Sequence, residues 1–207
     1  MKGLIIKDLL NLRKYSRSVL SIILFYILFA YAVNDRSFIG GMIVLLFTMM
    51  AITSFSYDDL AKWDRYALSM PVSRKNMVLS KYTLSILLST TGTIISILVG
   101  LVFMTIKDKI NVLELLITSY IFLAISLLFI SILLPLIYKF GVEKTRILMM
   151  VVVSIPTAAV LLFNHFGFPL PTEAQFMFSL KISPLLVILC LFISNFISCR
   201  IYENLEI

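Results

Sequence analysis

Long apolar runs separated by short polar clusters dominate this chain. Six of them approach or exceed the length that crosses a membrane. They lie at Ser18–Val33, Phe38–Phe55, Lys81–Ile106, Val112–Tyr138, Ile147–Phe163 and Pro184–Tyr202. A bilayer core offers no water to backbone amides, and the alternation of a barrel strand is absent from these runs, so each is predicted to be a helix. The pattern predicts an all-α, polytopic protein with six transmembrane helices in one domain over residues 1–207.

Composition and charge agree with this class and narrow it. Hydrophobic residues make up 60% of the 207 residues, the mean hydropathy is +1.03, and the net charge is +7. Such a composition is too apolar for a soluble domain. The basic residues lie in the gaps between apolar runs, where they orient a protein in a membrane. We therefore expect no nucleic-acid partner, because no soluble face would present a basic groove.

Basic residues are distributed unevenly between the two sets of connecting segments. One set holds Lys2, Lys7, Arg13, Lys14, Arg17, Lys62, Arg65, Arg74, Lys75, Lys81, Lys139, Lys144, Arg146 and Arg200. The opposite set holds Arg36, Lys107, Lys109 and Lys181. Because cytoplasmic segments carry the excess of Lys and Arg, both termini and residues 56–81 are predicted to be cytoplasmic.

Two flanking segments have patterns of their own. Residues 1–17 are predicted to form an amphipathic helix along the inner leaflet, with a plain extension of the first span as the alternative. Its apolar face would hold Leu4, Ile5, Leu9 and Leu12, and Lys2, Lys7, Asp8 and Arg13 would lie elsewhere. The outer loop, residues 164–182, contains Pro169, Pro171 and several phenylalanines. It would be a partly re-entrant cap or an aromatic belt at headgroup level.

Small residues and prolines mark positions within the spans. Gly92, Ser96 and Gly100 are spaced four apart, which lets helix backbones approach closely. Their partner would be another span of the same subunit or a second copy of the protein. Ser183 and Pro184 match an N-cap and first helical position, so we expect the last helix to begin there.

No motif for catalysis occurs in the sequence. It lacks a Walker-type phosphate loop, a dinucleotide glycine fingerprint, an HExxH pair and a GxSxG elbow. Cys190 and Cys199 are expected to be buried thiols, and His165 has no partner at metal-ligand spacing. The middles of the spans lack the ionisable groups that an ion-coupled pump or an intramembrane protease needs. A transporter powered from outside the membrane remains compatible with this pattern.

A charged segment, YDDLAKWDRYALSMPVSRKNMVLSKY, spans Tyr57–Tyr82 between two apolar runs. It holds the only tryptophan, Trp63, and aromatic residues ringed by charges are common at interaction hot spots. The alternative is a solvated loop whose charges only satisfy topology. The Ser69–Pro71 stretch would break one helix, and Ser73 would cap the next. Arg74 and Lys75 would then lie near lipid phosphates of the inner leaflet.

This segment resembles the first cytoplasmic loop of permease subunits of type 2 ATP-binding-cassette (ABC) transporters. The resemblance is closest to a small six-span bacterial branch that includes phenol-soluble-modulin-type peptide exporters. It rests on the acidic pair, Lys62–Trp63, the Pro71–Lys75 run and Ser80–Tyr82, and the opening KGLIIKDLLNLRKY is also similar. The loop helix would be the coupling helix that docks on an ATPase, with Trp63 as its apolar anchor. The implied contact residues are Tyr57, Asp58, Asp59, Lys62, Trp63, Asp64, Arg65 and Tyr66.

The resemblance implies an export permease of the bacterial cytoplasmic membrane without its own motor. Two ATPase subunits would bind ATP and Mg, so we expect no cofactor in this chain. A second permease copy or paralogue and membrane lipids would be the other partners. The cargo would be a hydrophobic or amphipathic peptide or a lipid-like molecule. The alternatives are a non-transporting sensor or assembly protein that uses the same loop, and, ranked lower, a lipid-modifying enzyme built on Asp58, Asp59 and His165.

Overall fold

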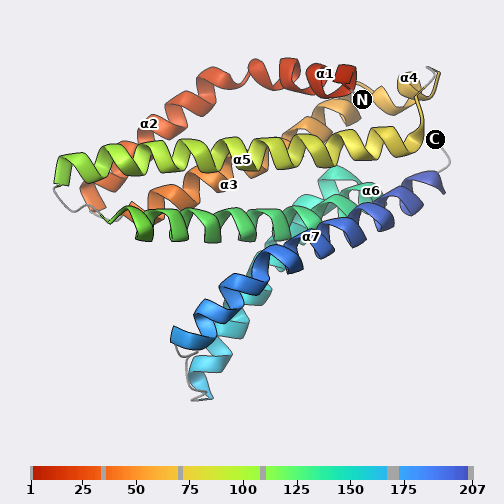
Figure 1. Ribbon diagram of the computed structural model, residues 1–207. Coiled ribbons are helices and arrows are strands. Elements are labelled where there is room, and N and C mark those ends of the chain that lie inside the picture. The colour runs from red at the N-terminus through yellow and green to blue at the C-terminus, as the bar shows by residue number, and fades with distance from the viewer. Residues whose placement is uncertain (1, 34–35, 70–71, 108–110, 167–172, 205–207) are drawn as a thin grey trace.

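The described part of the chain is helical throughout and contains no strand (Figure 1). The computed structural model describes residues 2–33, 36–69, 72–107, 111–166 and 173–204. The helices are α1 (Lys2–Arg13), α2 (Ser16–Val33), α3 (Arg36–Leu60), α4 (Trp63–Ser69), α5 (Arg74–Lys107), α6 (Val112–His165) and α7 (Glu173–Glu203). The expected all-α class is therefore confirmed for these residues.

The length and hydropathy of the helices indicate a multi-pass membrane protein. Within the described residues, four helical stretches are long and apolar enough to cross a bilayer: Ile39–Leu60, Arg74–Thr105, Val112–Ile155 and Gln175–Glu203. A shorter apolar helix covers Arg17–Phe29 and overlaps the first expected span. The fourth and fifth expected spans lie in one helix, α6, so the division into six spans stays a prediction. Of the expected outer loop, residues 164–182, only 167–172 lie outside the described residues; α6 continues to His165 and α7 begins at Glu173, so the expected loop bounds are too wide.

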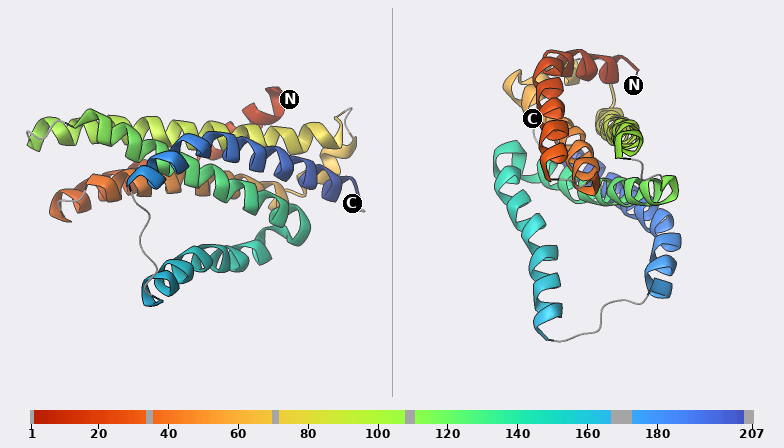
Figure 2. Two further views of the ribbon diagram at one scale, coloured as in Figure 1. Left: turned by 60° about the horizontal axis from the view of Figure 1, so that its bottom comes forward. Right: turned by 90° about the vertical axis from the view of Figure 1, so that its left-hand side faces the viewer.

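Helices α3 and α5 and the first arm of α6 run side by side, and the C-terminal half of α7 packs along α6 (Figures 1 and 2). Gly141 divides α6 into two arms, with φ of 79° and ψ of 172°. Glycine tolerates this left-handed backbone because it has no Cβ. The second arm of α6 and the N-terminal half of α7 leave the bundle and stand apart from each other in the right-hand view of Figure 2.

The small residues of α5 face neighbouring helices of the same chain. A Cβ added at Gly92 would lie 2.8 Å from Cβ of Phe47 on α3, and one at Gly100 would collide with Leu115 on α6. Ser96 is buried, and its hydroxyl lies against Gly40 of α3. The row at 92, 96 and 100 therefore takes part in close packing within the chain, and packing against a second copy stays a prediction.

A serine hydroxyl donates to the helical carbonyl that loses its backbone donor at proline. Pro135 has no N–H to donate to the carbonyl of Ser131, and Ser194 of α7 donates to that carbonyl instead, at 2.5 Å. Because the Ser194 proton is used there, the Tyr82 hydroxyl must donate to Ser194, 2.5 Å away, and accept from Ser198 at 2.8 Å. This buried network joins α5, α6 and α7.

The last helix corrects a prediction. Helix α7 begins at Glu173 and continues through Pro184, so the expected start at Ser183 is wrong. Pro184 leaves the carbonyl of Leu180 without its usual donor, and the Ser183 hydroxyl donates to it at 2.8 Å. Tyr120 of α6 contacts the same hydroxyl at 2.6 Å. Ser183 thus compensates the proline within the helix and does not cap it.

Replacing Ser194 with alanine is expected to lower the free energy of unfolding by about 1–2 kcal/mol, because the Ser131 carbonyl then has no donor in an apolar surround. Unfolding of the purified protein in mixed micelles measures this change. In a Pro135→Ala background, the new alanine supplies the missing N–H, so Ser194→Ala should cost less, and the remaining cost is the lost hydrogen bond from Tyr82. An equal cost in both backgrounds would refute the compensation.

Candidate functional site

The segments with excess positive charge meet at one end of the bundle. The N terminus, α4 and the C terminus lie together there (Figure 1). A cavity of about 250 Å³ at this end is bordered by six helices. Its wall includes Leu4, Lys7, Asp8, Phe55, Asp58, Asp59, Trp63, Met77, Ser80, Lys81, Ile137, Tyr138, Lys139, Gly141, Val142 and Tyr202. We call this end of the molecule the docking end, after the ATPase contact that the sequence leads us to expect there.

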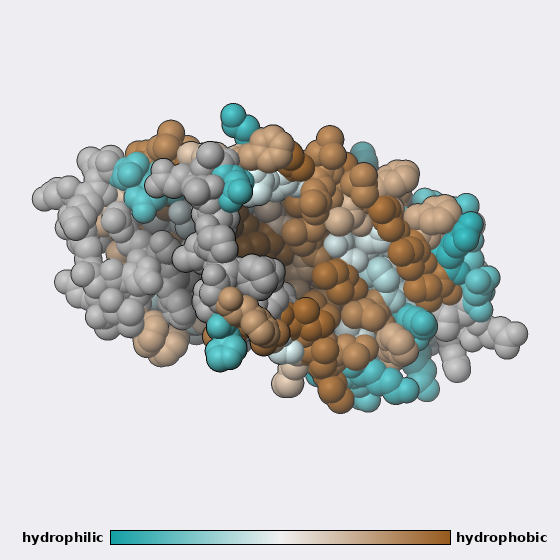
Figure 3. All heavy atoms as spheres, turned by 90° about the horizontal axis from the view of Figure 1, so that it is seen from below, coloured by the Kyte–Doolittle hydropathy of each residue, from teal (hydrophilic) through white to brown (hydrophobic). Residues whose placement is uncertain are grey.

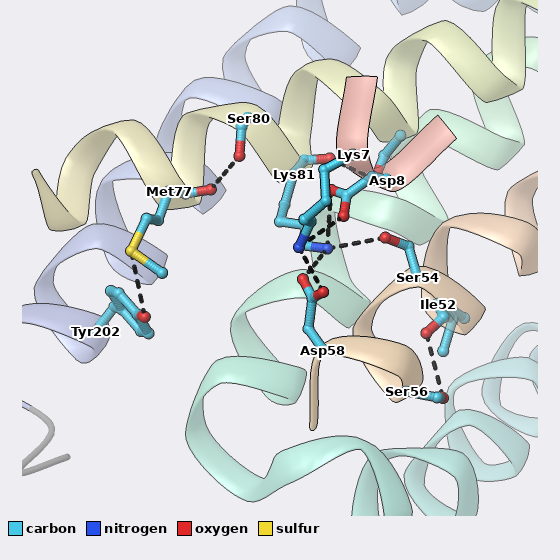
Figure 4. Close-up of polar contacts among 11 residues, drawn as sticks. Lys7, Asp8, Ile52, Ser54, Ser56, Asp58, Met77, Ser80, Lys81 and Tyr202 are labelled. Atoms are coloured by element: carbon cyan, nitrogen blue, oxygen red, sulfur yellow. Dashed lines mark hydrogen bonds and ion pairs between the residues drawn. The ribbon is translucent and has the colours of Figure 1, made fainter. Parts of the chain in front are cut away.

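Four charged side chains form a closed ring at the docking end (Figure 4). Lys7 Nζ lies 3.1 Å from Oδ1 of Asp8 and 2.5 Å from Oδ1 of Asp58. Lys81 Nζ lies 3.0 Å from Oδ2 of Asp8 and 2.5 Å from Oδ2 of Asp58. Positive and negative groups alternate around this charged ring of Lys7, Asp8, Asp58 and Lys81, and their charges sum to zero.

The charged ring ties together three helices that are far apart in the sequence. Lys7 and Asp8 come from α1, Asp58 from the end of α3 and Lys81 from α5. Asp8, Asp58 and Lys81 are buried, and the Lys81 ammonium also donates to the Ser54 hydroxyl at 2.8 Å. Burial of charge is costly unless each group is paired, and here every member contacts both opposite charges.

The ring corrects the expected orientation of α1. Asp8 was expected away from the face that holds Leu12, but both side chains are buried, and α1 packs on α3 and α5. Leu12 was expected on lipid, and it lies instead in a core cluster of the protein. The physical reason is pairing: Asp8 turns inward because two lysines neutralise it there. The contact of α1 with the inner leaflet stays a prediction.

Residues 57–66 do not form the single helix that was expected over Tyr57–Tyr66. Helix α3 continues to Leu60, and α4 begins only at Trp63. Lys62 between them has φ of 48°, a left-handed conformation that turns the chain sharply. The prediction of one helix is therefore wrong, because the apolar pattern of α3 carries its helix past Tyr57 and the bend falls at Lys62.

Side chains expected to contact an ATPase divide into inward and outward groups. Asp58 is buried in the ring, and Trp63 is half-buried with the Lys7 ammonium 4.1 Å from its ring centroid. Tyr57 is half-buried against Tyr15. The outward group holds Asp59, Lys62 and Tyr66. The side chains of Asp64 and Arg65 lie outside the described part of the structure.

Beyond Pro71, the chain returns to the bundle as expected. The Ser73 hydroxyl accepts a hydrogen bond from the Asn76 amide at 3.3 Å, so Ser73 caps α5, which begins at Arg74. Arg74 donates to the carbonyls of Tyr202 and Glu203 at 3.2 and 2.7 Å. Both carbonyls belong to the last turn of α7, where a cation interacts favourably with the negative end of the helix dipole, so the arginine anchors this turn. Lys75 is exposed, 3.7 Å from Glu203, and its contact with lipid stays a prediction.

Sequence reasoning missed the ring and one exposed side chain. Lys7 and Asp8 were assigned to orientation and to a polar face, and Lys81 to the start of a span. The signal was the position of these lysines and aspartates at the edges of apolar runs, but their pairing across the chain needs the fold. Leu60 was not singled out, although it is 82% exposed beside the bend at Lys62.

Comparison with known proteins places the chain in a family. A family model described as ABC-2 family transporter protein matches residues 3–203. A search of curated proteins and a search of solved structures each gave no significant match. The matched region contains the charged ring, α4 and every candidate span. The chain therefore belongs to the ABC-2 family of transporter proteins, the membrane permease components of ABC transporters.

Proposed function

We propose that this permease exports hydrophobic or amphipathic peptides, driven by ATP that two separate ABC ATPase subunits hydrolyse. Membership of the family implies an ABC ATPase partner. The two ATPases would bind ATP and Mg, and a second permease, identical or paralogous, would complete the pathway. The orientation that the basic residues favour puts the docking end in the cytoplasm, where ATP is available.

The outward side chains of the docking end support an ATPase interface. Leu60 is 82% and Tyr66 64% exposed, and the same stretch of sequence carries the exposed charges of Asp59 and Lys62. An apolar or aromatic anchor within a polar rim is the usual composition of an interaction hot spot. We therefore assign the apolar contact to Leu60 and Tyr66. Trp63, half-buried under Lys7, supports this surface from within.

The second arm of α6 supports an apolar cargo. One face of this arm borders a hollow, and its residues recur at helical spacing: Arg146, Met149, Met150, Val153, Ser154, Thr157, Ala158 and Leu161. Methionine side chains adapt to apolar partners of varied shape. Figure 3 views the molecule from the side of this arm, where apolar surface is broad and hydrophilic side chains gather toward the docking end. Such walls suit an amphipathic helix better than a sugar or an ion.

ATP hydrolysis by the reconstituted transporter tests peptide export. The permease and the ATPase that co-purifies with it are placed in liposomes, and an amphipathic helical peptide is compared with a scrambled peptide of equal composition. We expect only the amphipathic peptide to stimulate hydrolysis. Equal responses to both peptides, or to neither, would contradict the assigned cargo.

A pair of matched variants locates the cargo. Val153 borders the hollow, whereas Val151 lies outside it and is also about half exposed. Val153→Ala should raise the peptide concentration for half-maximal stimulation about three- to tenfold, because buried apolar surface is lost. Val151→Ala should leave that concentration unchanged. The assignment to this face fails if the two variants behave alike.

A further inference from the structure

The docking helix α4 is connected to the bundle by a bend that needs support. Lys62 adopts a left-handed backbone, which non-glycine residues rarely do and which persists only where surrounding contacts impose it. On the other side of this bend, Trp63 packs against the core cluster and lies under the Lys7 ammonium. The orientation of α4 thus depends on where Lys7 is held.

The charged ring holds Lys7 in that place. Its ammonium bridges Asp8 on its own helix and Asp58 at the end of α3, while it lies 4.1 Å from the Trp63 ring centroid. Asp8 in turn is fixed by Lys81 of α5. A cation over an indole ring is attracted to its face, so Lys7 contacts α1, α3 and α4 at once. Figure 4 shows Lys7 and Asp8 reaching from α1 toward Asp58 and Lys81.

We propose that Lys7 and Asp8 are positioning residues that fix the orientation of α4, so that α1 moves together with the surface that meets the ATPase. This inference rests on the proposed docking function, but the contact of Lys7 with Trp63 is tested on the permease alone. Because the remaining pair, Asp58 with Lys81, is neutral by itself, removing both α1 charges leaves no unpaired charge in the ring.

The experiment uses the only tryptophan as its probe. In Lys7→Met/Asp8→Asn, the emission of Trp63 should shift to longer wavelength and acrylamide quenching should increase about twofold, because α4 loses its cation–π anchor, reorients and exposes the indole to water. The thermal midpoint in detergent shows whether the variant is folded. The matched control, Lys2→Met/Glu143→Gln, removes the same charges at two exposed positions and should change neither property. Unchanged emission and quenching in the folded double variant would overturn the proposal.

Conservative replacement separates positioning from general packing. Lys7→Arg keeps the cation and should retain the wild-type emission, whereas Lys7→Gln should shift it. This pair also keeps the proposal testable if the double variant does not fold, and equal emission from the two variants would overturn it. Binding of the ATPase is measured on the same samples. If Trp63 emission shifts but ATPase binding is unchanged, the contact between Lys7 and Trp63 is supported. The proposed docking function is then refuted, and so is the positioning role that rests on it.

Discussion

Lys81→Met is expected to lower the free energy of unfolding by about 3–5 kcal/mol, the cost of leaving a buried charge without its partner. Lys81 contacts both carboxylates of the charged ring and is 8% exposed. Without it, Asp8 and Asp58 share the single cation of Lys7 and the ring carries a net negative charge. Thermal unfolding in detergent, monitored by fluorescence-detected size-exclusion chromatography, measures the loss of folded protein.

Two further variants separate pairing from other effects of this substitution. Lys81→Met/Asp58→Asn leaves the pair of Lys7 and Asp8, so most of the lost stability should return, since replacing a complete buried pair is often neutral. Lys75→Met removes a lysine of the same helix that is 73% exposed. It should cost about 0–1 kcal/mol, as exposed ion pairs do. Wild-type stability of Lys81→Met would refute the ring as a structural element.

Gly92→Ala is expected to cost about 1–3 kcal/mol, because overpacking a close helix contact forces the backbones apart. The added Cβ would lie 2.8 Å from Cβ of Phe47, an atom bonded to the α3 backbone that no rotamer change can move. The equivalent atom at Gly100 would meet the end of the Leu115 side chain, which can rotate away. Gly100→Ala should therefore change the free energy of unfolding little, since alanine also has a helix propensity about 1 kcal/mol better than glycine.

Unfolding of both alanine variants in mixed micelles checks this order. Phe47→Ala in the Gly92→Ala background would keep the Phe47 Cβ, so it should not relieve the clash. Phe47→Gly removes that atom, and the cost of Gly92→Ala should fall in its presence. Equal stability of Gly92→Ala and Gly100→Ala would contradict the backbone contact between α3 and α5.

The apolar pattern predicted the helices well because hydrophobic length and helix-breaking residues are local properties. Ser73 was predicted as a cap, and it caps α5 because hydroxyl capping needs only three neighbouring residues. The sequence also predicted that the basic segments gather at one end, because successive spans cross the membrane in opposite directions and alternate connections share a side. The start of α7 was not predicted, because the Ser183 hydroxyl donates to the carbonyl that Pro184 leaves without its usual donor, and the helix continues through the proline.

The site was less predictable because it depends on contacts across the fold. Trp63 and its neighbours were identified by type, but which side chains face outward depends on the bend at Lys62. Asp8 reads as a polar-face residue on its own helix, and only Lys81, far along the chain, makes its burial favourable. Pairing of this kind is a tertiary property and leaves no periodic signal in one sequence.

We propose that an ABC ATPase docks where α3 ends and α4 begins. The most direct test is the affinity of the purified ATPase for wild-type permease and for Leu60→Ala/Tyr66→Ala. We predict a loss of at least about tenfold, the level expected for hot-spot residues, with Leu113→Ala as an exposed control at the opposite end. Unchanged affinity of the double variant, with the control also unchanged, would contradict the claim.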